Sequence, residues 1–147
     1  VDPFETISNY GPDATRWYMI SNANPWDNLK FDIEGIEESK RKFFGTLYNV
    51  YSFFALYANI DNFHYCEETV PPQKRNEMDR WILSELNRTI KTVTDRMDAF
   101  DNYNACHSIN SLVDGLSNWY VRRSRNRLRN ATTFGEGELI ASRGKRN

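Results

Sequence analysis

Three long stripes of apolar residues at helical spacing constrain the fold of this 147-residue chain more than any other feature. In each stripe, apolar side chains recur every three or four residues, which places them on one face of an α-helix. The stripes run through residues 34–60, 76–98 and 102–120. A stripe of this length cannot bury its apolar face alone, so the sequence predicts an all-α fold, an antiparallel helical bundle.

Residues with a strong preference for helix ends set the expected boundaries. Asp2 precedes Pro3 and is expected to cap a short first helix, and Asp13 is expected to cap the next. Asn76 stands where the second long helix should begin, and Asp101 where the third should begin. The ends of the stripes and the capping residues therefore agree.

Two further local patterns suggest details of packing. The alternation of Leu29, Phe31 and Ile33 predicts a short extended segment before the first long helix. Gly45 lies inside that helix and weakens it by up to about 1 kcal/mol relative to alanine, so we expect a close contact with another helix there. We divide the chain into a linker at 1–33, a helical bundle at 34–129 and a disordered or tag-like tail at 130–147.

The charges are unevenly distributed along the chain. Residues 1–119 carry 11 Lys and Arg against 18 Asp and Glu, a net charge of −7, whereas residues 120–147 carry 8 against 2, a net charge of +6. Basic chain ends are common in proteins that bind nucleic acids. The alternative is a solvated basic tail with no partner, and charge alone leaves both interpretations open.

Other functional classes find little support. Cys66 and Cys106 are distant thiols, typical of a reducing, cytoplasmic setting, and the spacing of His64 and His107 around them does not suit zinc. No apolar run is long enough to cross a bilayer, so we expect a soluble protein without membrane contact. Gly-rich phosphate loops and nucleophile motifs are lacking, and we predict no catalytic residue, metal or cofactor in this segment.

The best candidate for a functional surface is an arginine-rich helix end. Within one stretch of helix, Arg122, Arg125 and Arg129 point to one side, and Arg123 and Arg127 to an adjoining one. Guanidinium groups fork onto phosphates and stack on unpaired bases, and Trp119 and Tyr120 could extend the surface. In the alternative interpretation, both aromatic side chains finish the core and the arginines pair with acids of neighbouring helices.

A second candidate is the stretch Tyr-Gly-Pro-Asp-Ala-Thr-Arg-Trp-Tyr at 10–18. Arg16 could fold back onto Asp13 or reach a neighbouring domain, with Trp17 packed beside it. Taken alone, this is a capped amphipathic turn with aromatic packing.

Several phrases, in order along the chain, resemble the class I aminoacyl-tRNA synthetases and in particular the isoleucine enzymes. The N-terminal Val-Asp-Pro and the stretch at 10–18 resemble the segment after the Lys-Met-Ser-Lys-Ser loop of that family. The later matching segments lie at 24–31, 43–49, 51–54, 79–84 and 119–125. The resemblance covers roughly residues 1–129, and the joint occurrence is more specific than any single phrase.

The resemblance implies a truncated anticodon-binding bundle preceded by a linker, from an enzyme that joins isoleucine to its tRNA with ATP and magnesium. It implies tRNA contact through Arg122, Arg123, Arg125 and Arg127 with Trp119 and Tyr120, and contact with the catalytic domain of the same enzyme through Asp13, Arg16 and Trp17. The alternatives are the same domain from a valine, leucine or methionine enzyme, or a stand-alone helical protein-interaction module.

Overall fold

The computed structural model describes residues 2–63 and 70–130, and within these ranges it contains helices and loops but no strand. The predicted all-α fold is therefore confirmed. The helices are α1 (Pro3–Tyr10), α2 (Pro12–Ser21), α3 (Ile33–Ser39), α4 (Gly45–Ile60), α5 (Glu77–Asp98), α6 (Asn102–Asp114) and α7 (Arg122–Asn130). A short 3₁₀ turn, η2 (Pro72–Lys74), precedes α5.

Two stretches of π-helix join these helices into longer rods. The stretch η1 (Lys40–Phe44) connects α3 to α4, and η3 (Gly115–Val121) connects α6 to α7. At the end of η1 the amide of Gly45 donates to the carbonyl of Lys40, five residues earlier, which is the π-helical spacing. Each of the three predicted stripes thus lies on one rod: 33–60, α5 and 102–130.

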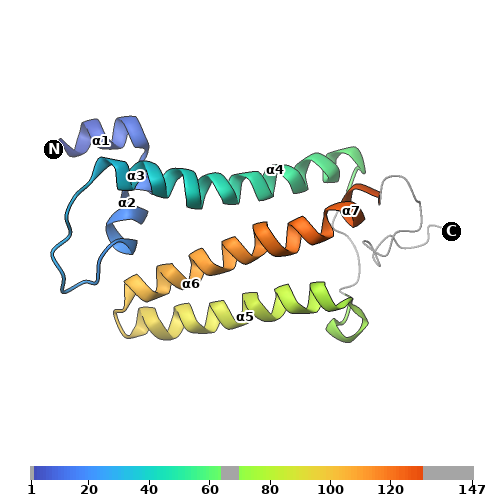
Figure 1. Cartoon of the computed structure of the whole chain (residues 1–147). Coiled ribbons are helices and arrows are strands. Elements are labelled where there is room, and N and C mark those ends of the chain that lie inside the picture. Colours follow the sequence, from blue (N-terminus) through green and yellow to red (C-terminus); the bar gives the residue numbers. More distant parts are fainter. Residues whose placement is uncertain (1, 64–69, 131–147) are drawn as a thin grey trace.

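The three rods lie side by side, with α6 between α4 and α5 (Figure 1). The helices α5 and α6 form an antiparallel hairpin, and α4 runs in the same direction as α6. The linker helices α1 and α2 pack at the end where α3 begins, and α7 lies at the opposite end. The arginine-rich segment and the linker are therefore separated by most of the length of the bundle.

Most of the predicted caps are confirmed. The Asp2 carboxylate accepts a hydrogen bond of 2.8 Å from the amide of Phe4. The side chains of Asn76 and Asp101 accept from the amides of the third residues after them, at 2.8 and 3.2 Å. The prediction for Asp13 was wrong. The helix α2 begins one residue earlier, with Gly11 as its cap and Pro12 in first position, so Asp13 lies in the first turn.

A small core joins the linker to the first rod. Ala14 and Tyr18 of α2 pack against Ile36 of α3, which is completely buried. The extended segment predicted at Leu29, Phe31 and Ile33 is confirmed only in part, since Asp32 has extended backbone angles but Ile33 already begins α3. The chain there forms an irregular loop, because the hydroxyl of buried Tyr18 donates to the carbonyl of Lys30 at 2.9 Å and accepts from the amide of Asp32 at 3.0 Å. Those bonds occupy backbone groups that a strand would pair.

The glycine that packs closely against another helix is Gly35, not Gly45. A β-carbon added at Gly35 would lie 3.1 Å from Cζ of Tyr18 and closer still to Cε2. At Gly45 an added β-carbon would meet only the carbonyl oxygen of Lys40 at 3.5 Å, within its own rod. The expected helix contact at Gly45 was therefore wrong, since no side chain of another described helix approaches it.

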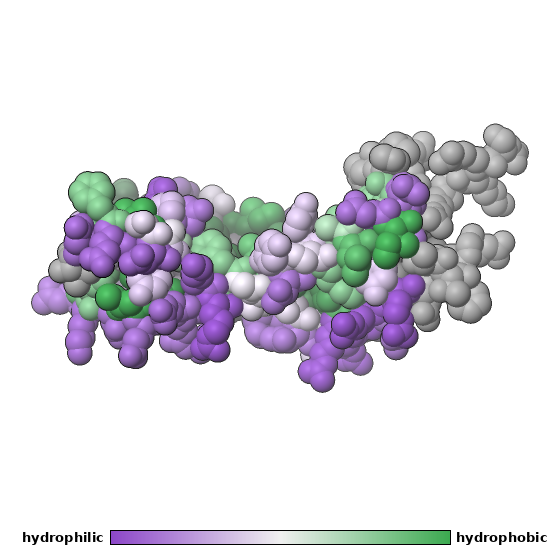
Figure 2. Space-filling model, turned by 90° about the horizontal axis from the view of Figure 1, so that it is seen from above, coloured by the Kyte–Doolittle hydropathy of each residue, from purple (hydrophilic) through white to green (hydrophobic). Residues whose placement is uncertain are grey.

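Much of the apolar stripe on two rods stays open to solvent. On α4, Leu47, Tyr51 and Phe54 share one face and are 40%, 64% and 52% exposed. On α5, Leu86, Ile90 and Met97 are exposed in the same way. Figure 2, which looks onto the molecule from the α4 side, shows further hydrophobic side chains gathered near the α7 end. The described helices thus bury only part of the apolar surface that the sequence provides.

Candidate nucleic-acid interface

The arginine-rich segment forms the last turns of the rod at 102–130, at one end of the bundle (Figure 1). Arg122, Arg123, Arg125 and Arg129 are exposed there. None of the four forms an ion pair with an acidic side chain of the described residues; Arg129 donates only a long hydrogen bond of 3.4 Å to Asn126. These four guanidinium groups therefore keep donors available for an outside partner.

Aromatic side chains support two of these arginines. The guanidinium carbon of Arg123 lies 4.7 Å from the ring centroid of Trp119, one turn earlier on the same helix. That indole is half exposed. The guanidinium of Arg125 lies 5.8 Å from the ring of Phe53 on α4. Such contacts hold a guanidinium group in place without consuming its hydrogen-bond donors.

The fifth arginine is engaged inside the protein. The Nη1 atom of Arg127 donates to Oδ2 of Asp79 at 2.8 Å, and Nη2 donates to Oδ1 at 2.5 Å. The hydroxyl of Tyr120 donates to the same carboxylate at 2.7 Å. The side chains of Arg127 and Asp79 are 24% and 20% exposed. The result is a bidentate, largely buried ion pair between α7 and the first turn of α5.

The pKa shifts of this cluster agree with its geometry. Burial raises the pKa of Asp79, but hydrogen bonds from Arg127 and Tyr120 and the charges of Arg127 and Arg75 outweigh it and lower the pKa below its usual value. The hydrogen bond to Asp79 raises the pKa of Arg127. Burial, together with the hydrogen bond to Asp79, raises the pKa of Tyr120 to about 12. The cluster therefore holds an ionised carboxylate, a charged guanidinium and a neutral phenol.

Asp79 is the member of this cluster that we did not predict as a site residue. The sequence did carry a signal for it. Tyr120, Ser124 and Arg127 recur at helical spacing on one face of the rod. Only the structure shows that this face packs against another element, since Ser124 is 4% exposed. Asp79, three residues after the cap Asn76, is an acidic residue that could pair with Arg127. Only the packing of α5 against η3 and α7 shows that Asp79 is the acid that does so.

The predicted linker residues behave differently from one another. Asp13 and Arg16 are exposed and form no ion pair with each other or with other described residues. Trp17 instead stacks on Phe43 of η1, with ring centroids 4.1 Å apart and the planes 4° from parallel. The structure thus assigns Trp17 to the contact between the linker and the first rod, whereas Asp13 and Arg16 face solvent.

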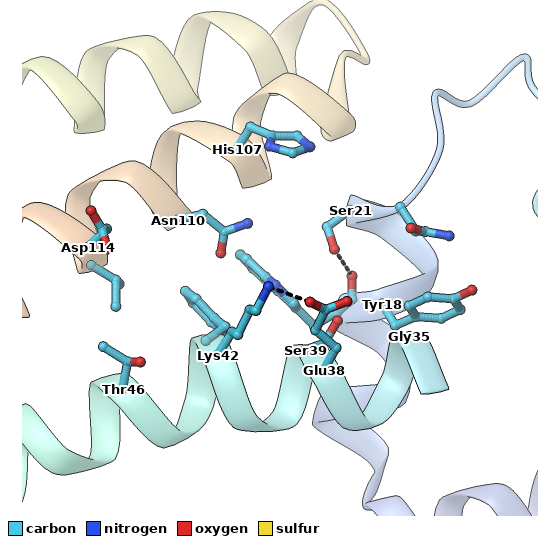
Figure 3. A pocket seen from close by; sticks show the side chains of 14 residues that line it. Tyr18, Ser21, Gly35, Glu38, Ser39, Lys42, Thr46, His107, Asn110 and Asp114 are labelled. Atoms are coloured by element: carbon cyan, nitrogen blue, oxygen red, sulfur yellow. Dashed lines mark hydrogen bonds and ion pairs between the residues drawn. The ribbon is translucent and has the colours of Figure 1, made fainter. Parts of the chain in front are cut away.

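Beside that aromatic stack lies an open cleft of about 430 Å³, lined by α2, α3, η1, α4 and α6 (Figure 3). Its polar side chains include Lys42, which is paired with Glu38, and Asn110 and His107 of α6. Among the described residues, Lys42 is the sole lysine or arginine that lines the cleft, and the acidic residues Glu38 and Asp114 line it as well. An anionic ligand therefore finds a weaker site here than at α7.

No three His, Cys, Asp or Glu residues of 2–63 and 70–130 are placed to hold a metal ion. Burial raises the pKa of the Cys106 thiol, which keeps it protonated. His64, Cys66 and residues 131–147 of the tail predicted at 130–147 lie outside the described residues, whereas Asn130 ends α7. No described helix is long and apolar enough to cross a membrane.

Comparison with known proteins identifies the family. The sequence profile of the family "Anticodon-binding domain of tRNA ligase" matches residues 79–141, from α5 to beyond the last described residue. An isoleucine–tRNA ligase of Porphyromonas gingivalis is 60% identical over 128 residues, and one of Cytophaga hutchinsonii is 55% identical over 144 residues. One of Clostridium tetani is 47% identical over 127 residues.

These alignments cover 86% to 97% of this chain but only 11% to 12% of each relative. The chain therefore spans about one-ninth of the length of the curated relatives it matches. All three relatives are isoleucine enzymes, in agreement with the assignment within class I made from the sequence phrases. With the all-helical fold and the profile match, they show that the chain belongs to the isoleucine–tRNA ligase family and is a segment containing its anticodon-binding domain.

Proposed function

We propose that this chain binds the anticodon arm of an isoleucine-accepting tRNA. The longer enzyme to which such a segment belongs would join isoleucine to that tRNA with ATP and magnesium in the cytoplasm. The observation that carries the proposal is the cluster of four exposed arginines on α7 beside a half-exposed tryptophan. We call the surface formed by Arg122, Arg123, Arg125, Arg129 and Trp119 the arginine face.

The arginine face has the chemistry that single-stranded RNA requires. Guanidinium groups donate in a planar fork that matches phosphate oxygens, and an exposed indole provides a platform on which an unpaired base stacks. Base stacking on an aromatic side chain contributes about 1–3 kcal/mol per base. Since residues 120–130 contain five arginines and no acid, this segment itself adds no repulsion of the phosphate backbone.

The linker completes the proposal at the other end of the molecule. Asp13 and Arg16 are exposed and have no ion-pair partner among the described residues, so we assign them to contact with the catalytic domain of the same enzyme. Trp17 contributes indirectly, by stacking on Phe43 and holding α2 against the first rod.

A salt titration tests the proposal. Fluorescence anisotropy would measure the affinity of the chain for a labelled anticodon stem–loop of isoleucine tRNA between about 50 and 200 mM salt. The affinity falls as salt rises, and replacing Arg122 by Gln should make this dependence less steep. The slope of log K against log salt should become about 0.7–0.9 less negative, the value for one lost phosphate contact. Arg88→Gln removes an exposed arginine of α5, paired with Glu85, and serves as the matched control.

The control variant should leave the slope unchanged. If Arg88→Gln and Arg122→Gln make the slope less steep by the same amount, the positive charge of the chain acts without a defined surface and the proposal fails. A stem–loop with a scrambled loop should bind more weakly than the native loop. Equal affinity for the two loops would show that the arginine face binds only the sugar–phosphate backbone of the RNA.

A protein-interaction module is the second candidate, favoured by the half-exposed Leu47, Tyr51 and Phe54 on α4. Such a module would bind an acidic protein partner through the basic helix and these apolar side chains. Polyglutamate competing with the stem–loop at equal charge concentration would support this candidate and count against specific RNA recognition.

A further inference from the structure

We propose that Asp79 is a positioning residue for RNA binding, and that Arg127 and Tyr120 act through it rather than by touching RNA. The ion pair of Asp79 and Arg127 would fix the direction in which α7 leaves the bundle and so orient the arginine face. This inference rests on the proposed function. It separates Arg127 from the four exposed arginines, with which it was grouped on the basis of sequence alone.

Both terminal nitrogens of Arg127 are already engaged. Both terminal nitrogens donate to Asp79, and Nη2 also lies 3.5 Å from the hydroxyl of Tyr120 and 3.4 Å from that of Ser124. Three-quarters of the side chain is buried. A phosphate that binds the two terminal nitrogens of Arg127 would have to displace a bidentate carboxylate, whereas Arg122, Arg123 and Arg125 can bind it without losing an internal partner.

The position of the pair makes it a joint between two chain segments that are far apart in sequence. Asp79 and Arg127 are 48 residues apart, and the pair joins the first turn of α5 to the last turns of α7. The helix dipoles favour this arrangement, since an acid is stabilised at a helix N-terminus and a cation at a C-terminus. In addition to this ion pair, two contacts earlier in α7 hold it against the bundle. They are the buried Ser124 and the contact of Arg125 with Phe53.

Electrostatics alone makes the opposite prediction for Asp79. A carboxylate at the basic end of an RNA-binding protein repels phosphates, so its neutralisation should tighten binding. If Asp79 positions α7, its neutralisation should weaken binding, because the exposed arginines lose their common orientation. The sign of the effect therefore distinguishes the two roles.

The experiment measures the affinity of the anticodon stem–loop for Asp79→Asn, with Glu77→Gln as a matched control. Glu77 is exposed, lies two residues earlier in the same turn and has no ion pair among the described residues. Both variants remove one negative charge. Each phosphate contact contributes about 0.7–0.9 to the steepness of log K against log salt. Extrapolated from 1 M to 0.1 M salt, the loss of one contact therefore lowers the affinity about five- to eightfold. We expect at least that loss for Asp79→Asn and unchanged or tighter binding for Glu77→Gln.

A double-mutant cycle checks that Asp79 acts through Arg127. Under the proposal, Arg127→Gln weakens binding as much as Asp79→Asn does, and the double variant is no weaker than either single variant. If Arg127 touches phosphate itself, Asp79→Asn frees it and binds more tightly, while Arg127→Gln binds more weakly. That pattern would overturn the inference.

A milder change keeps the inference testable if Asp79→Asn does not fold, as judged by circular dichroism. Tyr120→Phe removes one hydrogen bond to the carboxylate and keeps the ion pair. Because a single hydrogen bond makes a modest net contribution, it should weaken stem–loop binding by about two- to threefold. Tyr103→Phe, a hydroxyl loss on α6, should leave binding unchanged. Unchanged binding in Tyr120→Phe would refute the positioning role. If the arginine face itself does not bind RNA, Arg122→Gln will have no effect either, and this outcome identifies failure of the proposed function.

Discussion

Replacing Gly35 by Ala should destabilise this protein, although alanine is normally the better helix former. In a helix interior the exchange stabilises by about 1 kcal/mol. At Gly35, however, the added β-carbon would lie 3.1 and 3.2 Å from Cζ and Cδ2 of Tyr18, and closer still to Cε2. The clash involves the body of a buried ring, not the end of a flexible side chain.

Tyr18 cannot move away without loss. Its ring packs edge-on against Phe31, and its hydroxyl donates to the carbonyl of Lys30 and accepts from the amide of Asp32. Overpacking costs about 1–3 kcal/mol, and each hydrogen bond that breaks costs about 1 kcal/mol more. After the gain in helix propensity is subtracted, we expect Gly35→Ala to lower the free energy of unfolding by about 1–3 kcal/mol.

The matched control is Gly45→Ala in α4. An added β-carbon there would meet only the carbonyl oxygen of Lys40, at an ordinary contact distance of 3.5 Å. The helix-propensity gain then remains, and the variant should be more stable by about 0.5–1 kcal/mol. Urea unfolding followed by far-ultraviolet circular dichroism measures both changes. A Gly35→Ala variant as stable as the wild type would refute the packing argument for α2 against α3.

Three further predictions follow from single side chains. Tyr18→Phe should lower the free energy of unfolding by about 1–3 kcal/mol, measured by urea unfolding, because the amide of Asp32 and the carbonyl of Lys30 both lose a partner. The pKa of Tyr120 is raised to about 12, so the folded protein holds this proton more tightly than the unfolded chain does. The stability that Tyr120 contributes should be complete below about pH 10 and lost as the pH rises towards 12, seen as a shrinking difference from Tyr120→Phe. Cys106 is buried and its pKa is raised, so iodoacetamide should modify it much more slowly in the folded protein than in urea; equal rates would contradict its burial.

The sequence alone determined the secondary structure and the family. Apolar residues three and four apart predicted the rods that the structure contains, and Asp2, Asn76 and Asp101 marked helix starts correctly. These signals are local, since a cap and a helical stripe depend on neighbouring residues of one segment. The prediction failed at Asp13 and, in part, in the loop before α3. There, Gly11 and Pro12 set the start of α2, and the hydroxyl of Tyr18 organises the loop backbone.

Only the tertiary structure decided which of the adjacent arginines are available. On a helix drawn from the sequence, Arg127 is equivalent to its neighbours, because periodicity gives directions around an axis but not the element that each direction meets. The rotation of α7 against the first turn of α5 brings Arg127 to Asp79 and leaves Arg122, Arg123, Arg125 and Arg129 exposed. The same cause separates Gly35 from Gly45. Both are glycines in helices, but only the packing of α2 brings an aromatic ring against one of them.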